Sequence, residues 1–158
     1  MHATVSTMID LDADARSGPD LVDLPAEHPG WQSALPVLQE LRGALTAELL
    51  AQVLAEGEPQ GLRFLAAFRD GGCVGLAGWR LIANTSATRK LHVDDLVTTA
   101  AGRSEGVGAA LLQELERRAR AAGCTLLDLD SGVQRHAAHR FYLRERFDID
   151  AHHFAKQL

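Results

Sequence analysis

Residues 96–112 read L-V-T-T-A-A-G-R-S-E-G-V-G-A-A-L-L, and the order of these residue types predicts a strand, a loop and a helix in succession. The first turn of a helix leaves backbone N–H groups unpaired at the positive end of the helix dipole. Gly106 and Gly108 lack a Cβ, so phosphate oxygens can approach these amides closely, and Arg103 is positioned to add a charged contact. We therefore expect an anion site here, with a phosphate group as its ligand.

The spacing of these glycines disfavours two other phosphate-binding motifs. A dinucleotide-binding fold needs a third glycine three residues after Gly108, where this sequence has Leu111. The phosphate loop G-x-x-x-x-G-K-[ST] is absent from the chain. Taken alone, the two glycines could also serve only a tight turn from strand to helix, and the motif by itself leaves that alternative open.

Hydrophobic periodicity predicts one domain of α/β or α+β class with a mixed, mostly antiparallel sheet flanked by helices. The turn at 70–72 requires an antiparallel pair, whereas the helical crossover after residue 98 favours a parallel one. Residues 1–30 are acidic and rich in proline and glycine, so at most a short strand near 3–8 is expected there. Two short helices are expected within 31–56, the second capped by Thr46. The remaining expected elements are strands at 62–68, 73–82, 91–98, 125–129 and 149–156 and helices at 107–122 and 134–144.

Length, composition and charge are those of a single globular domain in a reducing compartment. The chain has 158 residues, 46% of them hydrophobic and 23% charged, and its two cysteines are far apart. We expect a cytoplasmic protein, because the first residues do not resemble a secretory signal and no apolar run is long enough to cross a membrane. A net charge of -5 argues against general nucleic-acid binding. Residues 1–60 carry 2 basic and 10 acidic side chains, whereas residues 61–158 carry 14 and 11, so the second part could bind a small polyanion.

Segment 96–112 resembles the acetyl-CoA motif of the GNAT superfamily of N-acetyltransferases. A second segment, 127–147 (L-D-L-D-S-G-V-Q-R-H-A-A-H-R-F-Y-L-R-E-R-F), is similar to the later strand and helix of that superfamily, and its part 135–145 resembles aminoalkylphosphonate N-acetyltransferases. The resemblance implies a single GNAT-like domain over 1–158, with residues 62–158 as the acetyl-CoA-binding core. It also implies a sheet splayed between two of its strands, with the pantetheine arm of acetyl-CoA in the cleft between them.

The resemblance further implies a set of cofactor-binding residues and one proton donor. Backbone groups of the strand would contact the pantetheine and the acetyl carbonyl, and the loop and helix amides would hold the pyrophosphate beside Arg103. Tyr142 matches the tyrosine that protonates the departing thiolate of CoA. Arg135 stands where the family often has an asparagine, and Arg146 replaces the usual glycine of a tight turn. The complete expected cofactor-binding set is Leu96, Val97, Thr98, Arg103, Ser104, Glu105, Gly106, Val107, Gly108, Ala109, Arg135 and His139.

The expected reaction is direct attack of a primary amine on the thioester, which requires a base. An alkyl ammonium with a pKa of about 10.4 has to lose a proton, at a cost of roughly 4–5 kcal/mol near pH 7. Strand alternation places His92, Asp94 and Leu96 on one face and Asp95 on the other. The resemblance implies a base two or four residues before Leu96, which is Asp94 or His92, or a water chain leading to one of them. Asp94 is slightly favoured because a carboxylate also attracts a cationic acceptor.

The acceptor is expected to be a small molecule, although the sequence leaves two other functions open. One is a non-catalytic acyl-CoA sensor or partner-binding module, and the other is acetylation of a protein or peptide. No metal is expected: His136 and His139 lie three residues apart, but no carboxylate or cysteine pattern completes a ligand set. The acidic N-terminal third gives no support to an aminophosphonate acceptor. The expected last strand could pair at a sheet edge with a second subunit, which would make a homodimer.

Overall fold

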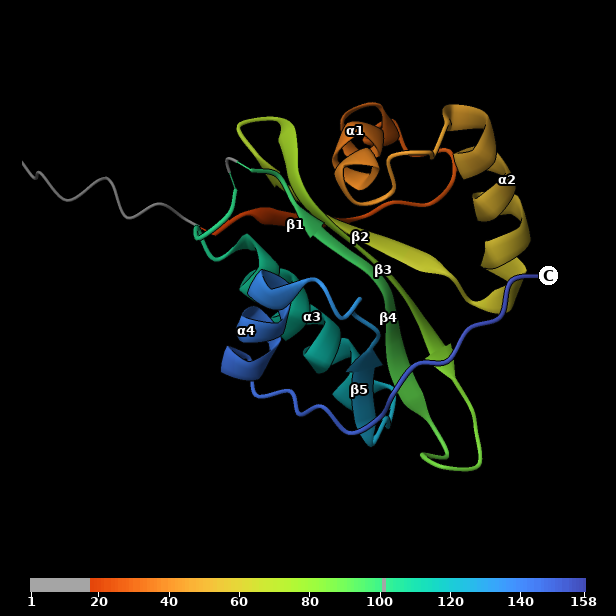
Figure 1. Ribbon diagram of the computed structural model, residues 1–158. Helices are drawn as coiled ribbons and strands as arrows, with labels where there is room; N and C mark the ends of the chain where they lie inside the picture. The colour runs from red at the N-terminus through yellow and green to blue at the C-terminus, as the bar shows by residue number, and fades with distance from the viewer. Residues whose placement is uncertain (1–17, 101) are drawn as a thin grey trace, which may run out of the picture.

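The structure, a computed structural model, describes residues 18–100 and 102–158. Figure 1 shows helices α1 and α2 on one face of a twisted sheet and α3 and α4 on the other. The predicted strand near residues 3–8 lies outside the described residues. The elements in chain order are β1 (Asp20–Asp23), α1 (Trp31–Leu41), α2 (Ala47–Gly57), the 3-10 turn η1 (Glu58–Gln60), β2 (Arg63–Arg69), β3 (Gly72–Ile82), β4 (Lys90–Thr98), α3 (Val107–Ala121), β5 (Leu126–Leu129) and α4 (His136–Arg144).

The sheet has the order β1-β2-β3-β4-β5, antiparallel throughout except for the parallel pair β4–β5. This arrangement confirms the predicted mixed, mostly antiparallel sheet in one α+β domain. The turn between β2 and β3 uses positive φ angles at Asp70 (52°) and Gly71 (78°), as a tight hairpin requires. Thr46 is the N-cap of α2, as predicted: its Oγ1 accepts a hydrogen bond of 3.2 Å from the backbone N–H of Leu49.

The predicted final strand at 149–156 is wrong, because residues 147–158 form no helix or strand. Its apolar side chains have no core to cover: Ile149 is 73% exposed and Phe154 90% exposed. The alternation of apolar and polar residues in 149–156 is therefore not enough for this segment to pair with the sheet. The predicted homodimer through this strand loses its structural basis.

β4 and β5 diverge after a short pairing. They pair only from Lys90 with Leu126 to Val93 with Leu129, and β4 then continues to Thr98 without a partner on that side among the described residues. The splayed sheet implied by the resemblance is therefore present. The part of β4 that no longer pairs with β5 ends near the start of α3, as Figure 1 shows.

A β-bulge in β4 changes which side chains share a face of the sheet. Gly78 pairs with Asp95 and the next residue, Trp79, pairs with Val93, so Asp94 is the extra residue. An extra residue shifts the side-chain alternation by one position beyond it. The regular alternation assumed from the sequence is therefore wrong at this point.

The bulge separates residues that were predicted to lie together. Leu91 and Val93 pack with α3, so His92 points to the α1 and α2 side. Beyond the bulge Leu96 packs on the α3 side, and Val97 packs on the α1 side. His92 and Leu96 thus lie on opposite faces, contrary to the prediction.

Two apolar clusters hold the helices to the sheet, one on each face. The cluster under α3 includes Val107, the first residue of that helix, which is 0% exposed. Val107 can pack directly on β3 because residue 75 is glycine: a Cβ there would lie 2.7 Å from Val107 Cγ1. This contact positions the N-terminus of α3 beside the open end of β4.

Candidate active site

A cleft of about 840 Å³ lies between the end of β4, the start of α3 and α4. Most of the cofactor-binding residues expected from the sequence are brought together in it. Those that line the cleft are Leu96, Val97, Thr98, Arg103, Ser104, Gly106, Val107, Gly108, Ala109 and Arg135. Tyr142 of α4, the predicted proton donor, also lines it.

The N-terminus of α3 leaves its first backbone amides available to a ligand. Gly106 is the residue before the helix, and no side chain caps this end. Its φ of 78° is in the left-handed region, and a Cβ placed on it would meet no protein atom within 4 Å. The turn therefore needs glycine for its conformation and leaves open space beside it, which fits a phosphate group held by main-chain N–H groups.

Gly108 lines the cleft and also has a packing role. A Cβ at this position would lie 3.1 Å from Cζ of Phe141, so the glycine makes room for α4 against the first turn of α3. Besides the predicted approach of a phosphate, the packing of Phe141 is therefore a second reason for glycine at position 108. Arg103, the expected charged contact, has 66% of its side chain exposed and lies 3.7 Å from a carboxylate oxygen of Glu40.

Tyr142 lies among aromatic rings at the cleft, and its hydroxyl is protonated. Its ring lies between those of Phe141 and Phe147, at centroid distances of 5.4 and 5.9 Å. Burial raises the pKa of its hydroxyl above the usual value, an effect that the positive charge of Arg135 opposes only in part. The phenol therefore keeps its proton at neutral pH. Arg146 adopts a φ of 67°, so the tight turn after α4 forms without the family glycine.

Two predicted cofactor residues lie outside the cleft lining. Glu105 forms an ion pair with Arg69 of β2. His139 faces away, because its Nε2 lies 2.9 Å from the backbone oxygen of Gly132. The expectation that His139 packs beside the cofactor therefore does not match its position. Its hydrogen bond instead fastens α4 to the loop that follows β5.

The two candidate bases are held by different partners, and neither lines the cleft. Asp94 Oδ2 accepts a hydrogen bond of 2.9 Å from Nε of Arg80 on β3. His92 Nδ1 lies 2.8 Å from Oδ1 of Asp128 on β5, and Lys90 Nζ lies 2.5 Å from the other oxygen. A carboxylate only accepts hydrogen bonds, so Nδ1 carries the hydrogen and Nε2 of the neutral ring is free to take a proton.

Sequence reasoning missed Asp128 and Arg80, which are 36 and 14 residues from their partners. Only the strand register, in which Asp128 lies opposite His92 and Arg80 lies opposite the same histidine, could have found them. One local signal exists for Asp128: it lies between Leu127 and Leu129, which pack on the α3 side, so alternation predicts that the Asp128 side chain points to the opposite face.

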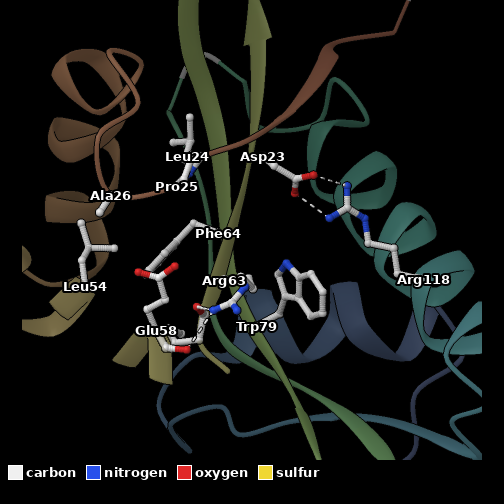
Figure 2. A pocket seen from close by; sticks show the side chains of 11 residues that line it. Asp23, Leu24, Pro25, Ala26, Leu54, Glu58, Arg63, Phe64, Trp79 and Arg118 are labelled. Atoms are coloured by element: carbon white, nitrogen blue, oxygen red, sulfur yellow. Dashed lines mark hydrogen bonds and ion pairs between the residues drawn. The ribbon is translucent and has the colours of Figure 1, made fainter. Parts of the chain in front are cut away.

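A separate cavity of about 380 Å³ is lined by residues of β1, β2, β3, α2 and α3, and Figure 2 shows its lining. Asp23 and Arg118 form a hydrogen bond of 2.6 Å at one side of it, with the Arg118 guanidinium 5.6 Å from the centre of the Trp79 ring. Arg63 donates to the backbone oxygen of Glu58 at 3.0 Å. None of the site residues expected from the sequence lines this cavity.

In residues 18–100 and 102–158 no three histidine, cysteine, aspartate or glutamate side chains are grouped as metal ligands would be. Within the same part of the chain, no helix has the length and apolar character needed to span a bilayer.

Comparison with known proteins gives concordant results. The pattern of the acetyltransferase (GNAT) family matches residues 27–147. The uncharacterized N-acetyltransferase YhdJ of Bacillus subtilis is 34% identical over 128 residues, which are 80% of this chain and 90% of that protein. The aminoalkylphosphonate N-acetyltransferase of Salmonella typhimurium is 31% identical over 98 residues, 61% of this chain and 64% of that protein. Among solved structures, the aminoglycoside N-acetyltransferase AAC(6')-Iy in complex with CoA has a TM-score of 0.77 at 15% identity, covering 91% of this chain and 97% of its own.

Proposed function

Because the chain belongs to the GNAT acetyltransferase family, whose members are acetyl-CoA-dependent N-acetyltransferases, we propose that it acetylates the primary amine of a small molecule. The observation that carries the proposal is the cleft, which combines the uncapped start of α3 with the protonated hydroxyl of Tyr142. Two of its relatives are named for small acceptors, an aminoalkylphosphonate and an aminoglycoside. These names support the hypothesis that the acceptor of this protein is also a small molecule.

The residues of the cleft fit acetyl-CoA. The open space at Gly106 and the free amides of α3 suit a pyrophosphate, and the unpaired length of β4 up to Thr98 offers backbone groups to the pantetheine. Acetyl-CoA supplies an activated acetyl group as a thioester. Arg103 and Arg135, both in the cleft lining, add positive charge near the phosphates.

We assign the base role to His92 and a structural role to Asp94. Arg80 occupies one oxygen of Asp94 in an ion pair between β3 and β4, which favours a structural role for this carboxylate. Asp128 holds the imidazole of His92 through Nδ1, so that Nε2 is the nitrogen that takes the proton. Since His92 does not line the cleft, a water chain carries the proton to it.

The proton and bond changes balance with these two groups. The acceptor ammonium first loses one proton to solvent and becomes a neutral amine. As the N–C bond forms, this amine gives a further proton through water to Nε2 of His92. As the C–S bond breaks, the hydroxyl of Tyr142 gives a proton to the departing sulfur. The proton held by His92 then returns through solvent to the tyrosine, and both groups recover their starting state.

The test combines a binding measurement with a turnover measurement. CoA should bind at micromolar concentration by calorimetry, and thiol should be released from acetyl-CoA with members of an amine panel. Tyr142→Phe should lower kcat by about a hundredfold or more while leaving the Kd of CoA unchanged, because proton transfer by a positioned group contributes roughly that much. His92→Gln should lower kcat more than Asp94→Asn does.

Three outcomes would contradict the proposal in different ways. Absence of CoA binding removes the cleft as a cofactor site. Binding without turnover on any amine, unaffected by Tyr142→Phe, indicates a non-catalytic acyl-CoA sensor. Turnover of peptides but of no small amine indicates a protein or peptide acetyltransferase.

A further inference from the structure

A third cavity, of about 500 Å³, lies beside β4 under the connection between α1 and α2. No residue assigned to the cofactor or to proton transfer lines it. Its wall is mostly hydrocarbon, supplied by α1, α2, the loop between them and β2. We call it the leucine pocket, and its large apolar side chains are Leu38, Leu45, Leu49, Leu50, Val53 and Phe64.

The leucine pocket and the cofactor cleft share a wall. Asp95 lines the pocket, and the next residue of β4, Leu96, lines the cleft. On α1, Leu38 lines the pocket whereas Glu40 lines the cleft. The pocket and the cleft are therefore lined by consecutive residues of β4, next to the strand segment that is expected to hold the acetyl group.

Of the residues that the structure describes, one carboxylate lines the leucine pocket, and one of its two oxygens already accepts a hydrogen bond. Oδ1 of Asp95 accepts a hydrogen bond of 2.8 Å from Nε of Arg42 and lies 2.7 Å from its Nη2. Oδ2 accepts no hydrogen bond from residues 18–100 or 102–158. The side chain is 15% exposed, so this free oxygen lies in a largely desolvated position.

Gly78 gives the free oxygen its place beside the apolar wall. A Cβ on Gly78 would lie 3.3 Å from Oδ2 of Asp95 and 2.9 Å from Cε1 of Phe64. The glycine therefore allows the carboxylate oxygen and the aromatic ring to lie next to each other over the sheet. A cation that met Oδ2 would have its attached hydrocarbon against Phe64 and the leucines.

We propose that the leucine pocket binds the acceptor, and that the acceptor is a monoamine whose body is an aliphatic or aromatic hydrocarbon. This inference rests on the proposed function and specifies its substrate class. One carboxylate oxygen that still lacks a donor can accept a hydrogen bond from one ammonium group, and it cannot match the several ammonium groups of a polyamine. The hydrocarbon wall offers no partners for sugar hydroxyls, and the guanidinium of Arg42, which also lines the pocket, is already paired with Asp95 and so is not free for a phosphonate; both would be bound at a cost.

The exposure of α2 agrees with a hydrocarbon ligand. Leu49 is 47% exposed and Val53 is 42% exposed, although both are large apolar side chains that line the pocket. A bound alkyl chain or aromatic ring covers these groups and removes their apolar surface from water.

The first experiment compares acceptors at saturating acetyl-CoA by thiol release. We expect kcat/KM for n-hexylamine and 2-phenylethylamine to exceed that for kanamycin and 2-aminoethylphosphonate at least tenfold. An equal or higher kcat/KM for kanamycin or 2-aminoethylphosphonate overturns the proposal.

The second experiment locates the binding site with matched variants. Leu49→Gln places a polar group on the pocket wall and should raise the KM for n-hexylamine at least tenfold with the Kd of CoA unchanged. Leu81→Gln is the control, because Leu81 is similarly exposed at 43% but lies on β3 outside the pocket. If the two variants change the KM for n-hexylamine equally, the acceptor does not bind in the leucine pocket.

A third measurement separates failure of this inference from failure of the proposed function, because it needs no turnover. In the presence of CoA, n-hexylamine should raise the Tm more than 1-hexanol does, and Asp95→Asn should abolish that difference. Binding with this pattern but no thiol release leaves the pocket assignment intact and refutes the transferase. CoA binding without any n-hexylamine binding refutes the pocket assignment.

Discussion

Replacing Gly106 by alanine separates the conformational role of this residue from its role in cofactor binding. Gly106 has a φ of 78°, and Gly123, just beyond the other end of α3, has a φ of 72°. Neither would bring a Cβ within 4 Å of a protein atom. Alanine at either position is therefore expected to cost about 1–2 kcal/mol for its left-handed backbone alone, which lowers the Tm by about 2–8 °C in a domain of this size.

Only the change at Gly106 should also weaken CoA binding. Gly106 lines the cleft, so an added methyl group or a relaxed turn displaces the amides of α3 from the pyrophosphate. Loss of one hydrogen bond to a charged group is worth about 1.5–3 kcal/mol, which corresponds to roughly a ten- to hundredfold rise in Kd. Titration calorimetry of CoA against Gly106→Ala and Gly123→Ala measures this difference directly. If both variants bind CoA as tightly as the natural sequence does, the pyrophosphate is not held at the start of α3.

Two further predictions concern cysteine reactivity and acid stability. Burial raises the pKa of Cys73, so iodoacetamide should label Cys124 in the native protein and Cys73 only after denaturation. Mass spectrometry of the two cysteine-containing peptides measures this difference. Fast labelling of Cys73 in the native protein would contradict its burial. Hydrogen bonds from Arg117 and Arg118 lower the pKa of Glu114 to about 2, so its contribution to stability is complete above the usual value near 4.5 and is lost as the pH falls through about 2. Glu114→Gln should therefore lower the free energy of unfolding in urea by up to about 1 kcal/mol at pH 7 and by less at pH 2.5, whereas an equal loss at both pH values would show that charge is not involved.

Much of the cofactor cleft could be predicted from the sequence because its components are local. A strand, a loop and a helix start within residues 96–112 follow from residue types that are neighbours in the chain. The need for glycine at 106 is likewise a property of one backbone angle. Gly108 shows the limit of this reasoning, because its neighbour Phe141 lies on another helix, more than thirty residues further along the chain.

The base could not be identified from the sequence, since its identity depends on pairing between distant strands. Periodicity alone treated Asp94 as one more residue of a regular strand, whereas the bulge makes it the extra residue and lets Arg80 bind it. His92 acquires its partner only because β5 lies parallel to β4 in the register that brings Asp128 opposite it. A shift of one residue in either strand would turn these side chains to the other face.

The amino-acid sequence by itself determined the order of the elements, the mixed sheet and the glycine turn before α3, because each of these depends on residues that are close together in the chain. The tertiary structure alone decided that His92 meets Asp128, that Asp95 keeps one oxygen free and that residues 149–156 form no strand. Those outcomes depend on strand register, on one bulge and on whether a core surface is available. These are contacts between distant segments, and local residue patterns do not encode them.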